Sequence, residues 1–153
     1  MTGHIIKKII DIDASPEVVF NALIDPKDLT HWLPDVAILE PKVGGKFRFS
    51  FLKNSTRRSC DHQDGDSFSI GEIIELVENK KLVYTWKWDG STNFPQTTVT
   101  WELERLDTNK TRLTLTHSGF TGKESDRESA KNHDEGWSIH INELAAYCKE
   151  KMI

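Results

Sequence analysis

The sequence predicts an α+β fold in which an antiparallel sheet curves around a long C-terminal helix. Three observations predict it: helix signals directly after a first strand, a two-residue apolar period through the middle, and an amphipathic stripe in the last third. A sheet with one apolar face must cover that face, and the C-terminal helix is the only predicted element long enough to do so. No repeat or linker divides the 153 residues, so we expect one domain over 1–153.

The N-terminal part predicts a strand and two short helices. Residues 5–13 are rich in isoleucine, which favours a strand. Ser15 can then cap a helix whose first position, Pro16, suits a helix start. Apolar residues at helical spacing follow. The helix is expected to end at Asp25-Pro26, because a residue before proline avoids helical angles. A second short helix is expected over 27–32.

The middle of the sequence predicts an antiparallel meander. Turn signals at 44–45, 78–81 and 107–110, and predicted loops over 53–66 and 89–93, separate segments with apolar residues at alternate positions. One face of the sheet is therefore expected to be buried. The residues that indicate the strands are Phe47, Phe49 and Phe51; Phe68, Ile70, Ile74 and Leu76; Leu82, Tyr84, Trp86 and Trp88; Val99, Trp101 and Leu103; and Leu113, Leu115 and His117.

The last third predicts one long amphipathic helix. Ser125 and Glu128 fit a capping box. An apolar stripe at spacings of four, three and four follows, formed by Trp137, Ile141, Leu144 and Cys148. A helix over 134–152 would be about 28 Å long, enough to cross a sheet.

Composition excludes several classes of protein. The formal net charge of −4 argues against a nucleic-acid partner. No apolar stretch is long enough for a membrane span, and no secretory signal is visible. The chain has only two cysteines, and together with these features that low count predicts a cytoplasmic protein.

Sequence motifs predict neither a metal nor a cofactor. Cys60-Asp61-His62 and His133-Asp134-Glu135 are isolated, without the second pair that a zinc site needs. Gly44-Gly45 lacks the context of a phosphate-binding loop, and no dinucleotide-binding motif occurs.

Several segments, in order along nearly the whole chain, resemble the helix-grip START-like (SRPBCC) superfamily, and within it the homologues of the activator of heat-shock protein 90 (Hsp90) ATPase. The segments are Ile10 to Leu23, Trp32, Gly44-Gly45-Lys46-Phe47, Gly71-Glu72-Ile73, Leu82-Val83-Tyr84-Thr85-Trp86, His117-Ser118-Gly119-Phe120 and Gly136-Trp137. The resemblance implies a hydrophobic cavity between the sheet and the C-terminal helix. Across the superfamily such cavities hold lipids, sterols or aromatic metabolites, and a few members are cyclases or hydrolases. The eukaryotic activators carry a further N-terminal domain that contacts the chaperone, whereas this sequence opens on the helix-grip pattern. We therefore do not expect the family name alone to define an activity.

The candidate ligand-binding residues are mostly aromatic. Packing against one another in an ordinary core is the alternative to lining a pocket. Five tryptophans are hard to close-pack, because each buried indole N–H needs a partner. The candidates are Trp32, Phe47, Phe49, Trp86, Trp88, Trp101, His117, Trp137, His140 and Ile141.

Two basic or titratable side chains have alternative interpretations. His117, on the apolar face of its strand, is either a hydrogen-bonded core residue or a group that orients a ligand. Arg48 alternates with phenylalanines and should point to solvent; on the opposite assignment of faces it would bind an acidic ligand.

Three functions follow as hypotheses. The leading one is non-enzymatic binding of a small hydrophobic, lipid-like or aromatic molecule between sheet and helix. The alternative is a chaperone-associated interaction module, for which the family resemblance is the sole support. The third is an enzyme acting on a hydrophobic metabolite, with His117 as the best titratable candidate; no catalytic residue is assigned.

Overall fold

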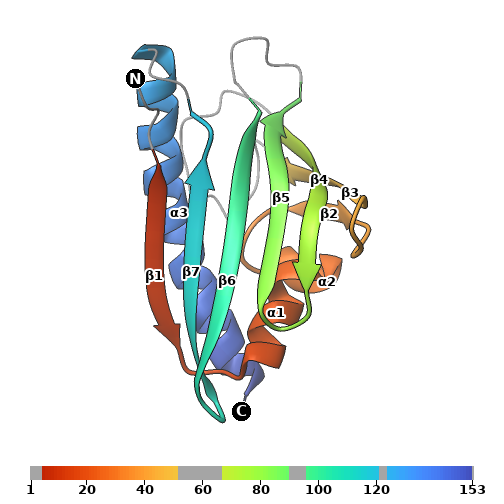
Figure 1. Cartoon of the computed structure of the whole chain (residues 1–153), viewed down its shortest axis with the longest axis vertical. Coiled ribbons are helices and arrows are strands. Elements are labelled where there is room, and N and C mark those ends of the chain that lie inside the picture. Colours follow the sequence, from red (N-terminus) through yellow and green to blue (C-terminus); the bar gives the residue numbers. More distant parts are fainter. Residues whose placement is uncertain (1–4, 52–66, 90–95, 121–123, 153) are drawn as a thin grey trace.

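Seven antiparallel strands form one curved sheet in the order β1-β7-β6-β5-β4-β3-β2 (Figure 1). The computed structural model describes residues 5–51, 67–89, 96–120 and 124–152. The strands are β1 (Ile6–Ile12), β2 (Val36–Leu39), β3 (Lys46–Phe51), β4 (Ser67–Val77), β5 (Lys81–Trp88), β6 (Thr97–Asp107) and β7 (Lys110–Ser118). The predicted α+β fold and meander are confirmed.

Two short helices follow β1, as predicted. Helix α1 (Pro16–Ile24) begins where the Ser15 hydroxyl accepts a hydrogen bond from the Val18 N–H at 3.3 Å. Asp25 ends α1, and its carboxylate caps α2 (Pro26–Leu29) by accepting from the Lys27 N–H at 2.8 Å. The second helix is shorter than the expected 27–32.

Helix α3 (Glu124–Lys151) covers one face of the sheet. It runs behind β1 and β7 in Figure 1, and its backbone lies near β1 and α1. The predicted stripe of Trp137, Ile141, Leu144 and Cys148 is buried, as expected for the side that faces the sheet. The helix starts ten residues before the expected 134, so Ser125 lies within it and not at its cap.

In strand β4 the buried positions differ from those that the sequence predicted. Its buried positions are Ser69 and Ile73, whereas Ile74 is 51% exposed. A register shift between Ile73 and Glu75 changes the alternation, so the apolar residues that indicated this strand do not mark one buried face. The predicted loop over 53–66, with Cys60-Asp61-His62, lies entirely outside the described residues, as does most of the predicted loop over 89–93.

Candidate functional site

The candidate residues gather on the sheet face that α3 covers. Ring contacts run from Trp32 to Trp101 at 5.8 Å between centroids, from Trp101 to Trp137 at 5.5 Å, and from Trp137 to Trp86 at 5.6 Å. His140 lies 6.3 Å from Trp137. Ile141 is buried four residues after Trp137. The predicted residues on the strands and on the helix therefore form one continuous cluster, which we call the aromatic cluster.

Trp86 is the centre of the aromatic cluster. Its ring lies 6.1 Å from Phe47, 6.2 Å from Phe49 and 5.6 Å from Trp88, all on neighbouring positions of the same sheet face. The side chain of Trp86 is 2% exposed. Aromatic pairs at these separations stabilise a core beyond the area that they bury.

Four of the five indole N–H groups have protein acceptors. Trp32 donates to the Ala22 carbonyl at 2.8 Å, and Trp101 to the Tyr84 hydroxyl at 3.0 Å. Trp88 donates to His133 Nε2 and Trp137 to His117 Nδ1, both at 3.0 Å. Trp86 Nε1 is buried and has no hydrogen-bond partner. A buried donor in that state is costly, so it identifies Trp86 as the exceptional member of the aromatic cluster.

Ser69 carries a second unpartnered polar atom on the same sheet face. Its hydroxyl is fully buried without a hydrogen-bond partner. Ser69 pairs across β4 and β5 with Trp88, two residues beyond Trp86. The sequence analysis missed Ser69 because it lies between Phe68 and Ile70, and apolar alternation directs attention to those neighbours. A polar residue on a buried face leaves no periodic signal.

His117 is held neutral by a hydrogen-bond relay. Its Nδ1 accepts from Trp137, so its Nε2 carries the proton and donates to Thr97 Oγ1 at 2.7 Å. The Thr97 hydroxyl in turn donates to the Trp86 carbonyl at 3.0 Å. Burial, and secondarily the neighbouring His133, lower the pKa of His117 well below its usual value. With both ring nitrogens engaged, His117 fits the hydrogen-bonded core interpretation and is poorly placed to act as a catalytic base.

The strand positions that face Trp86 and Ser69 are uncharged. The facing positions on β6 and β3 are Thr97 and Phe49. Tyr84 keeps its proton, because burial raises its pKa far above the usual value. Arg48 points to the other side of the sheet, as expected, where it pairs with Asp89 at 2.8 Å and lies over the Phe68 ring at 4.4 Å.

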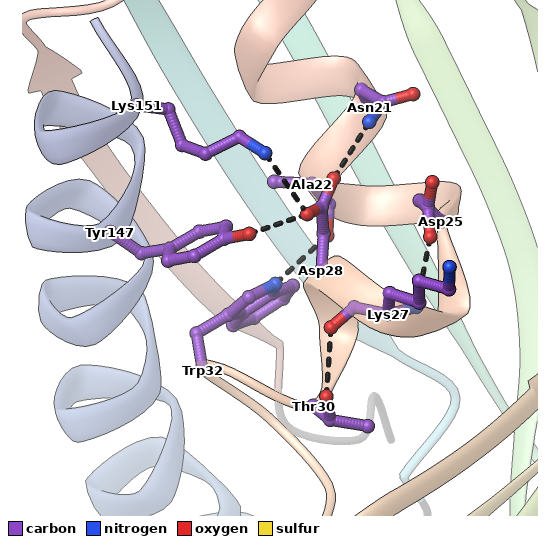
Figure 2. A network of polar contacts seen from close by, with 9 residues as sticks. All are labelled: Asn21, Ala22, Asp25, Lys27, Asp28, Thr30, Trp32, Tyr147 and Lys151. Carbon is purple, nitrogen blue, oxygen red and sulfur yellow. Dashed lines mark hydrogen bonds and ion pairs between the residues drawn. The ribbon is translucent and has the colours of Figure 1, made fainter. Parts of the chain in front are cut away.

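A polar cluster around Asp28 joins α2 to the C-terminal end of α3. Asp28 is 6% exposed and accepts hydrogen bonds from Tyr147 and from Asn21, the latter at 2.6 Å (Figure 2). Lys151 reaches the same carboxylate at 3.4 Å. Close by, the His140 Nδ1–H donates to the Trp32 carbonyl at 2.9 Å. These contacts fix α3 against the segment that carries Trp32.

Other features lie outside the aromatic cluster. A groove of about 550 Å³ lies on the opposite face of the sheet, between charged side chains such as Lys7, Lys81 and Glu102. It does not correspond to the predicted site. Within the described ranges, no group of three or more histidine, cysteine or acidic side chains could hold a metal ion. Of the helices described, none is long and apolar enough to cross a membrane.

Comparison with solved structures supports the fold. A protein from Chromobacterium violaceum is 25% identical, with a TM-score of 0.74 over 95% of this chain and 98% of that one. An HSP90 activator from Plasmodium falciparum is 27% identical, with a TM-score of 0.68 over 93% of this chain and 94% of that one. The Aha1 dimer from Colwellia psychrerythraea, at 21% identity and a TM-score of 0.68, covers 95% of this chain and 96% of its own. Among curated proteins, none matches this chain.

The family assignment comes from the sequence as a whole. The model of the family described as "Activator of Hsp90 ATPase homolog 1-like protein" matches residues 13–149, which run from the end of β1 almost to the end of α3. The solved structures above have the same fold, and the predicted helix-grip resemblance is confirmed. The chain therefore belongs to the family of activator of Hsp90 ATPase homolog 1-like proteins.

Proposed function

We propose that the protein binds a small hydrophobic molecule between the sheet and α3, against the aromatic cluster. The observation that carries this proposal is the buried Trp86 N–H, which lacks an acceptor although the other four indoles have one. Native proteins pair nearly all buried donors, so an exception needs an explanation, and a group bound from outside the chain is the one that we propose here.

Burial supplies the affinity. A ligand that buries about 300 Å² of apolar surface gains about 7 kcal/mol at about 25 cal/mol per Å², before the cost of association. Micromolar dissociation constants follow from that balance. Aromatic walls suit planar or acyl ligands, since ring faces offer large contact areas at little entropic cost.

Titration of protein labelled with ¹⁵N at tryptophan tests the proposal. Planar aromatic and acyl compounds are added while the five indole N–H signals are followed by NMR. Saturable shifts at Trp86, Trp88 and Trp137 are expected. If no compound moves these signals, or if the shifts are confined to the groove around Lys7 and Glu102, the binding proposal is wrong.

A chaperone-associated role is the second candidate. It is favoured by the likeness to the HSP90 activator from Plasmodium falciparum, which extends over almost the whole of both chains. The test is the ATPase rate of a purified Hsp90 with increasing amounts of this protein. A saturable rise in turnover is expected, and an unchanged rate at saturating concentration would remove this candidate.

A further inference from the structure

Trp86 and Ser69 are near neighbours on the buried sheet face, and each carries a polar atom without a hydrogen-bond partner. Ser69 pairs with Trp88, and Trp86 precedes Trp88 by two residues, so Ser69 and Trp86 are diagonal neighbours on adjacent strands. Both Trp86 Nε1 and Ser69 Oγ are buried and unpartnered. An indole N–H only donates, whereas a hydroxyl can donate or accept. The pair is therefore suited to a ligand atom that accepts hydrogen bonds.

The surroundings of the pair select an uncharged acceptor. Phe49 faces Ser69 from β3, and Thr97 faces Trp86 from β6. His117, 6.1 Å from Trp86, is kept neutral by burial, and Trp137 and Thr97 engage both of its ring nitrogens. The cations next to the pair along the described strands, Lys87 and Arg48, alternate with the buried residues and lie on the other face, where Arg48 is paired with Asp89. On these strands a bound carboxylate would lose its hydration without meeting a counter-charge, which is strongly unfavourable.

We propose that the ligand is a neutral hydrophobic molecule with a carbonyl group, such as an ester, ketone or amide, whose oxygen accepts from Trp86 Nε1 with Ser69 as a second donor. This inference rests on the proposed function and deepens it. The carbonyl oxygen fixes the orientation, and the apolar part packs on the rings of Phe47 and Phe49. Trp86 and Ser69 are then the residues that determine specificity.

Three probes of similar shape separate the contributions of the carbonyl group and of charge to the binding affinity. They are methyl 2-naphthoate, which carries a neutral carbonyl, 2-ethylnaphthalene, which lacks any acceptor, and 2-naphthoate, which is an anion at pH 7.4. We expect the ester to bind about tenfold more tightly than the hydrocarbon, because it satisfies a donor that the hydrocarbon leaves unpaired. The anion should bind more weakly than the ester. Only the ester should move the Trp86 indole proton downfield.

Two variants test whether the side chains of Trp86 and Ser69 produce the preference for the ester. Trp86→Phe keeps a ring but removes the N–H, so the preference for the ester over the hydrocarbon should fall from about tenfold to about twofold or less. Ser69→Ala should reduce the preference for the ester over the hydrocarbon about threefold. Ser50→Ala, on β3 but on the outward side of the sheet, is the matched control and should leave the preference unchanged. Because each variant is judged by a ratio of two affinities, a general change in packing cancels.

The outcomes separate the two proposals. If all three probes bind with equal affinity, or if Trp86→Phe retains the full preference for the ester, the neutral-carbonyl inference is overturned while hydrophobic binding stands. If the anion binds best, the inference is also overturned. If none of the probes binds, the proposed function fails and this inference fails with it.

Discussion

The neutral His117 makes a quantitative prediction about stability below neutral pH. Burial lowers its pKa well below 6.5, and Trp137 and Thr97 engage both ring nitrogens. In the unfolded chain the same histidine takes up a proton near pH 6.5. Below that pH the unfolded state therefore binds more protons than the folded state. The contribution of His117 to stability is complete above about pH 6.5 and is lost progressively as the pH falls.

The magnitude follows from the difference in pKa. Each pH unit below about 6.5 costs about 1.4 kcal/mol for one histidine, until the folded-state pKa is reached. Between pH 6.5 and pH 5.0, His117 alone should lower the free energy of unfolding by up to about 2 kcal/mol. For a domain whose total stability is about 5–15 kcal/mol, that is a large fraction.

Urea unfolding of the wild type and of His117→Gln at pH 7.0, 6.0 and 5.0 measures the effect. The variant should be about 1–3 kcal/mol less stable at pH 7.0, because Trp137 and Thr97 lose partners. It should also lose less stability on acidification, so the gap between the two proteins narrows by up to about 2 kcal/mol at pH 5.0. The two proteins differ only at position 117, so the difference between their profiles reports on His117 and its interaction with His133. Parallel pH profiles would refute the reasoning, since His117 would then titrate alike in both states.

Three further changes test other parts of the structure. Gly71→Ala should cost at least about 1–3 kcal/mol in urea unfolding, because an added Cβ would lie 1.9 Å from the Thr85 carbonyl oxygen and 2.4 Å from a Phe47 ring carbon; unchanged stability would contradict that close approach. Asp28→Ala should cost about 1–3 kcal/mol, since it leaves the Tyr147 hydroxyl without its acceptor; a loss below about 0.5 kcal/mol would mean that the polar cluster does not hold α3. Burial raises the pKa of Cys148 to about 12, with the Asp28 charge adding to it, so iodoacetamide at pH 8 should label Cys148 only in urea, and native labelling seen by peptide mass spectrometry would contradict its burial.

Most of the fold was predictable because local rules and burial agree there. Val99 and Trp101 on β6, and Leu113 and Leu115 on β7, alternate with polar residues and are all buried. The Ser15 cap and the Asp25-Pro26 boundary follow from local backbone chemistry. The start of α3 was placed too late, because the apolar stripe that indicated the helix begins only at Trp137, although Ala130 and His133 already contact the core and the sheet.

The candidate site was predictable only in part. The aromatic members were found because a buried strand face shows as a period of two. Ser69 was missed, and the difference between Trp86 and the other tryptophans was not visible, because the four indoles that have an acceptor find it on another element. Gly71, quoted for the family resemblance, acquires a physical reason in the structure: Phe47 packs directly against its backbone.

The sequence by itself determined which side chains face the covered side of β5, β6 and β7 and which helix covers them, since periodicity and length are properties of neighbouring residues. Only the tertiary structure decided which polar groups on that face are satisfied. Trp137 and His117 are twenty residues apart, and Trp88 and His133 forty-five. Hydrogen-bond pairing over such separations depends on how α3 lies across the sheet, and that placement leaves Trp86 Nε1 and Ser69 Oγ without hydrogen-bond partners.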